Sequence, residues 1–168
     1  MSAQAKELLS QRWNDGFVIA RTKSIPWTPW ALPGSYFKLL HINRAIGMSV
    51  ALVKLDPGEK TPPHHHYGDA IVYVLDGSFS YERGEIFEDD FICEPGGVTH
   101  EPTIGPKGLV TLTVFFSGLG GVDGDNRVAG FVGCDEMYQM ALKNGAAGHL
   151  PPPPDGAEDG ALKLNIKR

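Results

Sequence analysis

The stretch that decides the fold is GEKTPPHHHYGDAIVYVLDG, residues 58–77, followed further along the chain by PGGVTH, residues 95–100. Two prolines directly precede the three consecutive histidines and exclude a helix there, so the segment is predicted to be extended. Side chains alternate between the two faces of an extended chain. His64 and His66 therefore share one face, with Cα atoms about 7 Å apart, and His65 points to the other. Two imidazoles on one face can converge on a single cation.

A third histidine, His100, ends PGGVTH, where a Pro-Gly turn leads the chain back into a strand. If the strands of His64 and His100 are neighbours, three neutral imidazoles face one point. Imidazole suits Zn, Fe, Ni and Cu, and three protein ligands leave open positions on the metal, as catalysis requires. The pattern therefore predicts a metal site formed by His64, His66 and His100. A solvated surface cluster is the alternative for the consecutive histidines alone.

The sequence around these motifs is typical of an all-β protein. The 21 glycines and 13 prolines among 168 residues are too many for a helical bundle, but they suit short strands joined by turns. Asp76-Gly77 and Gly105-Pro106 are two of the predicted turns. Many short strands at this spacing predict a sandwich or barrel. The expected strands cover residues 36–43, 48–55, 71–75, 78–82, 91–94, 110–116 and 128–131.

The flanking segments differ from this region. Apolar residues at helical spacing predict a short helix over residues 3–13, which would end before Asn14-Asp15-Gly16. A second helix is expected over 135–144, with Asp135 as its N-cap and Gly145 just past its end. The expected organisation is an N-terminal helix and extended arm over 1–34, a single domain with its C-terminal helix over 35–149, and a Pro-rich tail over 150–168.

Charge and cysteine content limit the partners and the compartment. Lys and Arg total 15 against 20 Asp and Glu, and a net charge of −5 argues against nucleic acid or an anionic membrane as a partner. No apolar run is long enough to span a membrane, and no signal peptide is recognisable, so a cytoplasmic protein with Cys93 and Cys134 as free thiols is expected. Trp27 and Trp30 in the arm, together with the stiff tail, suggest a homodimer or a higher homo-oligomer.

The two histidine motifs resemble those of the cupin superfamily, and the resemblance covers about residues 35–132. The first cupin motif is matched by Gly58, His64, His66 and Gly77, and the second by Pro95, Gly97 and His100. The resemblance implies a double-stranded β-helix, a jelly-roll barrel, with a metal in its mouth. The chain also departs from the pattern. Ala70 or Ile71 stands where the first motif has its metal-binding glutamate, and Asp89 and Ile104 replace a glycine and an asparagine of the second.

Among cupins that lack this glutamate, the chain is most similar to the 2,4'-dihydroxyacetophenone dioxygenase and acetylacetone dioxygenase group. The segments YFKLLHINR, residues 36–44, and FFSGLGGVDGDNRVAGFVGCDEMYQMALKNG, residues 115–145, carry the resemblance beyond the metal motif. It implies Fe(II), with Zn or Ni as alternatives, and cleavage by O2 of a carbon–carbon bond beside a ketone. It also implies a glutamate near the metal from the hairpin that carries Glu82, which could equally be a solvated charge.

Other interpretations of the sequence remain open. A non-oxidative zinc cupin, such as an isomerase or hydrolase, and a metal-binding or small-molecule-binding cupin without turnover would carry the same motifs. Outside the cluster, His41 lies on another expected strand and is predicted to be half-buried, and His149 is predicted to be exposed with the tail. The sequence alone names neither the substrate nor the native metal.

Overall fold

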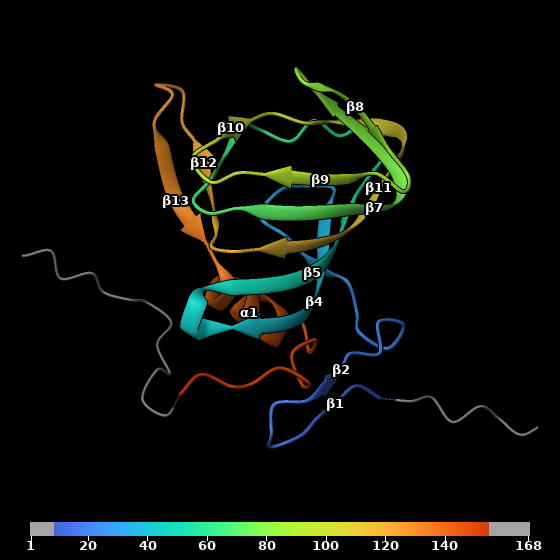
Figure 1. Ribbon diagram of the computed structural model, residues 1–168, viewed down its shortest axis with the longest axis vertical. Helices are drawn as coiled ribbons and strands as arrows, with labels where there is room; N and C mark the ends of the chain where they lie inside the picture. The colour runs from blue at the N-terminus through green and yellow to red at the C-terminus, as the bar shows by residue number, and fades with distance from the viewer. Residues whose placement is uncertain (1–8, 155–168) are drawn as a thin grey trace, which may run out of the picture.

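The computed structural model describes residues 9–154 and places them in two main β-sheets, one α-helix and a short 3-10 helix, η1 (Arg44–Ile46) (Figure 1). The larger sheet has the strand order β3-β4-β5-β11-β7-β8, with β9 also paired to β7, and the smaller has the order β10-β6-β12-β13. Together they confirm the predicted all-β barrel. The strands of the larger sheet are β3 (Thr28–Pro29), β4 (Ser35–Asn43), β5 (Met48–Leu55), β7 (Ala70–Tyr81), β8 (Gly84–Phe87), β9 (Phe91–Glu94) and β11 (Thr103–Phe115). Those of the smaller sheet are β6 (His64–His66), β10 (Thr99–His100), β12 (Leu119–Val122) and β13 (Val128–Val132).

The long strands β7 and β11 form the centre of the barrel. The expected turn at Asp76-Gly77 is wrong, because β7 continues through Gly77 with a change of register against β11. Gly77 has φ of +83°, and a Cβ there would collide with the carbonyl oxygen of Gly108. The expected turn at Gly105-Pro106 likewise lies inside β11, at an irregularity in the same ladder. In both places the turn residues bend a strand instead of ending it.

The expected N-terminal helix over residues 3–13 is wrong where the structure describes it, and residues 1–8 lie outside the described residues. Gln11–Arg12 form β1, which pairs with β2 (Val18–Ile19). The Asn14-Asp15-Gly16 segment joins these two strands, with Gly16 at φ of +91°. The preference of these three residues for a turn therefore outweighs the helical spacing of the apolar residues before them. Among the described residues, no helix is long and apolar enough to cross a membrane.

The helix α1 (Cys134–Lys143) closes the lower end of the barrel in Figure 1, behind β4 and β5. Gly133, not Asp135, is its N-cap, and the Gly133 N–H donates to the Glu136 carboxylate. Gly145 follows the helix as expected. The N–H groups of Gly145 and Ala146 bond back to the carbonyls of Leu142 and Ala141, which satisfies the last turn. The core between α1 and the sheet includes Phe37, Leu39, Ala51, Phe115, Met137 and Ala141.

The arm and the start of the tail both pack on the barrel of the same chain. Trp30 is half-buried and packs edge-on against Phe37 and Phe115, with ring centroids 5.7 and 6.0 Å apart. His149 is buried, contrary to the predicted exposure, and its Nε2 donates to the Leu39 carbonyl at 2.9 Å. Arg44 holds the adjacent segment through the carbonyls of Pro151 and Pro152. Of the expected tail, residues 155–168 lie outside the described residues.

Candidate metal centre

The three predicted histidines meet because β6 and β10 pair with each other. The strands are antiparallel, with His64 opposite His100 and His65 opposite Thr99. A hydrogen bond also fixes the turn before β10 against β6, because the Gly97 N–H donates to the His66 carbonyl at 2.7 Å. The register therefore places the side chain of His100 on the same face of the small sheet as those of His64 and His66.

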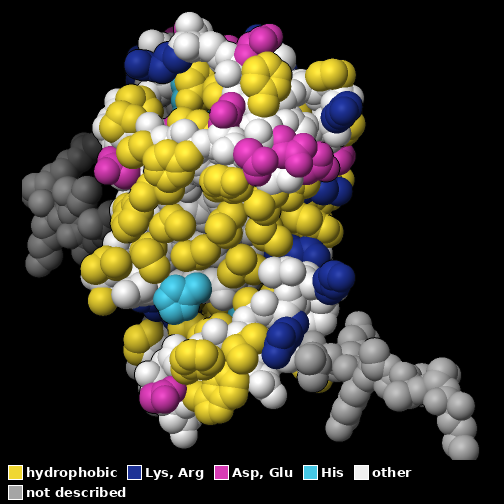
Figure 2. All heavy atoms as spheres, turned by 45° about the vertical axis from the view of Figure 1, so that its right-hand side comes forward, with side chains coloured by type: hydrophobic (Ala, Val, Ile, Leu, Met, Phe, Trp, Pro, Cys, Tyr) yellow, Lys and Arg dark blue, Asp and Glu magenta, His cyan; other side chains and the backbone are white. Residues whose placement is uncertain are grey.

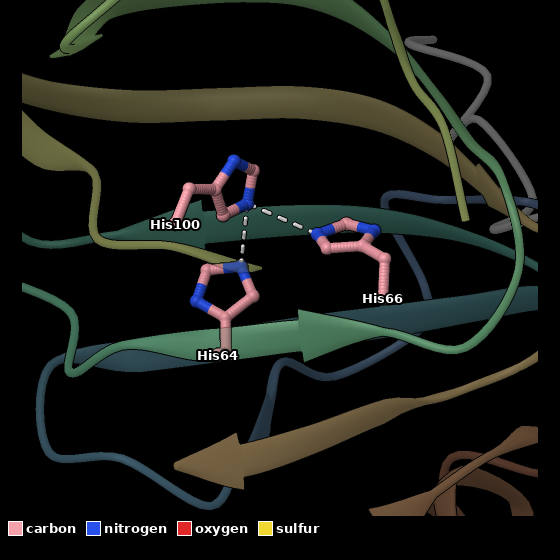
Figure 3. Close-up of side chains that lie close together, drawn as sticks. All are labelled: His64, His66 and His100. Atoms are coloured by element: carbon pink, nitrogen blue, oxygen red, sulfur yellow. Dashed lines mark hydrogen bonds between the residues drawn. The ribbon is translucent and has the colours of Figure 1, made fainter. Parts of the chain in front are cut away.

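The imidazoles of His64, His66 and His100 point toward one another (Figure 3). The Nε2 atom of His100 lies 3.0 Å from Nε2 of His64 and 3.0 Å from Nε2 of His66. Among the described residues these are the three whose donor atoms gather within 4.8 Å of one another. His65 turns away as predicted, and its Nδ1 lies 2.9 Å from the Thr99 hydroxyl.

The chemistry of this donor set fits a divalent transition metal. The Nδ1 of His64 lies 3.3 Å from the Pro62 carbonyl, so this nitrogen carries the proton and leaves the Nε2 lone pair facing its neighbours. Burial lowers the pKa of His64, and it lowers the pKa of His66 to about 3 and of His100 to about 4. The three rings are therefore neutral near pH 7. Converging neutral imidazoles are the ligands that Zn, Fe, Ni and Cu accept.

A carboxylate missed in the sequence stands beside this cluster. Glu94, the last residue of β9, has oxygens 3.7 Å from Nε2 of His66 and 3.8 Å from Nε2 of His100. Its side chain is buried, and this burial raises its pKa to about 7. The alternation of FICE indicates that Glu94 faces inward with Ile92, but it does not indicate that Glu94 lies beside the histidines.

The cluster lies in the wall of an apolar cavity of about 220 Å³ inside the barrel. Among the described residues that line it, Glu94 is the one carboxylate. The buried hydroxyls of Thr111 and Thr113, also in the lining, bond to each other at 2.9 Å. A concave apolar site with a few converging polar groups is the usual form of a small-molecule site. The apolar lining includes Trp30, Val53, Val72, Phe79, Phe115 and Leu119.

Comparison with known proteins agrees with this geometry. Residues 15–119 match the ChrR cupin-like domain. The chain belongs to this cupin family. A search of curated protein sequences finds no match.

Solved structures show the same fold at low identity. An RmlC-like cupin from Ralstonia eutropha JMP134 is 21% identical, with a TM-score of 0.69 over 79% of this chain and 89% of that one. An acetylacetone dioxygenase from Acinetobacter johnsonii is 18% identical, with a TM-score of 0.65 over 85% and 99%. A putative acetylacetone dioxygenase from Methylibium petroleiphilum PM1 is 17% identical, with a TM-score of 0.68 over 80% and 99%.

Glu94 of β9 supplies a carboxylate near the position where the first cupin motif has its glutamate. Ala70, one of the two residues at the motif's glutamate position, pairs directly with Glu94 across β7 and β9. The carboxylate therefore enters the cupin barrel from the neighbouring strand, at the same level of the sheet. The histidines therefore have a carboxylate beside them although the first motif lacks its glutamate. A linear motif could not reveal it, because the register between β7 and β9 is not written in either segment alone.

Glu82 lies further from the cavity of this cupin than Glu94 does. It is exposed in the turn between β7 and β8, and it lines a separate outer recess that also reaches Glu94 and His100. Its catalytic role stays a prediction. His41 is half-buried on β4, as expected, and is not part of the cluster.

Proposed function

We propose that this cupin is a non-haem Fe(II) dioxygenase that uses O2 to cleave a carbon–carbon bond beside a ketone. The observation that carries the proposal is the convergence of His64, His66 and His100 in the wall of an apolar cavity. Solved acetylacetone dioxygenases with the same fold support it. The substrate class is an enolisable aryl ketone or β-dicarbonyl.

The donor set explains why such a substrate would suit this site. His64, His66 and His100 are neutral, so they would leave a bound divalent ion with its full charge. An anionic enolate that chelates through two oxygens is then favoured over a neutral ketone. Iron(II) held there would supply the redox chemistry with O2.

The chain's own residues would prepare the substrate. Glu94 is the carboxylate of the cavity wall, beside the histidines, and it can accept the proton that a ketone releases when it becomes an enolate. The apolar walls, among them Val72 and Phe115, would hold the substrate's apolar ends and exclude water. The Thr111 and Thr113 hydroxyls bond to each other, and because this bond uses only one of their two O–H groups, the other could donate to a substrate oxygen.

A zinc enzyme without O2 chemistry is the second candidate. The same three imidazoles suit zinc, and Glu94 could move a proton in an isomerisation or hydrolysis. A binding cupin without turnover would use the same cavity. These alternatives differ from the dioxygenase in their requirement for O2 and in the metal that supports turnover.

An oxygen electrode distinguishes these functions. The chain is loaded with Fe(II), Zn(II) or Ni(II) and offered acetylacetone or 2,4'-dihydroxyacetophenone. We expect O2 uptake with iron alone, its loss in His100→Ala and a decrease of about 100-fold or more in Glu94→Gln. His65→Ala is the matched control and should retain uptake. Turnover of these ketones with zinc under nitrogen would support the non-oxidative enzyme, and no turnover with either substrate would contradict the proposed substrate class.

A further inference from the structure

The outer surface of the larger sheet carries apolar side chains at positions where a sheet with one face in water would carry polar ones. Strands β7 and β11 carry apolar residues on both faces, a pattern typical of strands covered on both sides. Five large side chains on this surface are strongly exposed: Tyr73 at 39%, Leu75 at 42%, Phe91 at 64%, Leu112 at 36% and Phe116 at 42%. We call the outer surface of β9, β7, β11 and β5 the outer face.

The strand register makes this surface continuous. Phe91 pairs with Tyr73, Tyr73 with Leu112, and Leu112 with Leu52, so one apolar row crosses four strands. Ile71, Val114 and Val50 form the next row. Figure 2 shows a broad expanse of hydrophobic side chains across the middle of the molecule. Contiguous apolar patches of this kind mark interaction sites on folded proteins.

A positive and a negative side chain lie on either side of β11, both opposite Val110. Val110 of β11 pairs with Lys54 of β5 on one side and with Asp76 of β7 on the other. Asp76 is exposed. The Lys54 ammonium lies 4.3 Å from the Tyr36 ring centroid, 5.7 Å from that of Trp27 and 3.8 Å from the Asp56 carboxylate.

We propose that the outer face binds a second copy of this chain, with a two-fold axis parallel to β11. Such an axis exchanges the two sides of β11, so Lys54 of each copy faces Asp76 of the other, and Leu112 lies near Leu112 of the partner copy. A two-fold axis perpendicular to the strands at the level of Val110 would instead oppose Lys54 to Lys54 and Asp76 to Asp76. The charges thus favour one of the two ways in which the sheets can pack face to face.

The self-complementary charge pattern is what selects a second copy as the occupant. The same surface supplies both members of each ion pair, and both pairs form at once across the axis. The apolar rows would then be covered by identical rows from the partner copy. The inference is independent of the proposed reaction, because the cavity opens from the inner face of the same strands.

Light scattering of the full chain tests the interface first. At micromolar concentration the wild type should have twice the 18.2 kDa chain mass, and Leu112→Lys should have the chain mass itself. Leu142→Lys is the matched control: Leu142 is 52% exposed on α1, away from the outer face, and its replacement should leave the dimer intact. An unchanged zinc content would show that Leu112→Lys is folded. A monomeric wild type, or a dimeric Leu112→Lys, would overturn the proposal.

A charge exchange tests the axis. Lys54→Glu and Asp76→Lys should each weaken dimerisation about tenfold or more, and the double variant should return to within a few-fold of the wild type. Recovery in the double variant also separates the contact between copies from any loss of stability caused by Lys54→Glu within one chain. Single variants that dimerise like the wild type, or a double variant weaker than both, would refute the proposed axis.

Discussion

The three side chains of β6 are consecutive in sequence but differ in their surroundings. His64 and His66 face His100, whereas His65 bonds to Thr99 on the opposite surface of the small sheet. Replacing His64, His66 or His100 singly with alanine should therefore remove most of the bound metal, and His65→Ala should retain it. Metal content measured after dialysis against Zn(II) or Fe(II) checks this. Equal losses in all four variants would show that the face assignment is wrong.

His149 gives a separate prediction for pH. Burial lowers its pKa below the ordinary 6.5, so the unfolded chain takes up this proton before the folded chain does. Stability should therefore decline as pH falls below about 6.5. His149→Gln retains an N–H for the Leu39 carbonyl and has no such proton, so its melting temperature should fall less between pH 7.5 and 5. Parallel melting curves for the two proteins would contradict this role of His149.

At the scale of elements, the bend in β7 depends on one residue. Gly77→Ala would need a positive φ and would force the new methyl group against the Gly108 carbonyl. We expect a loss of at least about 2 kcal/mol in the free energy of unfolding. Gly130→Ala is the control: its φ of +74° is similar, but its Cβ would meet nothing within 4 Å, so the cost should be about 1 kcal/mol. Urea denaturation of both variants measures the difference.

The elements also show what the sequence could predict. Met48–Leu55 and Phe91–Glu94 match their predicted bounds, because each is a run of strand-forming residues with a clear break beside it. Strand alternation predicted that His64 and His66 share one face, and the similarity to the second cupin motif added His100. Glu94 was missed although its strand was predicted, since its place beside the histidines depends on which strand β9 pairs with and in which register. The sequence predicts a turn at Asp76-Gly77 because the local preferences of these residues are the same for a turn and for a bulge within a strand.

For the whole molecule, metal binding should stabilise one part of the barrel more than the rest. The three histidines join β6 to the turn and strand that carry His100, so a bound ion would hold these segments together. Zinc at 100 times its dissociation constant should add about 2.7 kcal/mol to the free energy of unfolding. Hydrogen exchange should slow most at residues 64–66 and 97–100. Equal slowing throughout the barrel, or none, would contradict a site at these strands.

The alternation along β11 has a consequence for how this chain can diverge. Thr111, Thr113 and Phe115 look into the cavity, and the residues between them, Leu112 and Val114, look outward. Odd and even positions of this strand therefore have different surroundings, the cavity on one side and the outer face on the other. A substitution can retune the cavity without changing the exterior, whereas a one-residue insertion or deletion would exchange the two sets at once. This segment should tolerate replacement far better than a change in length.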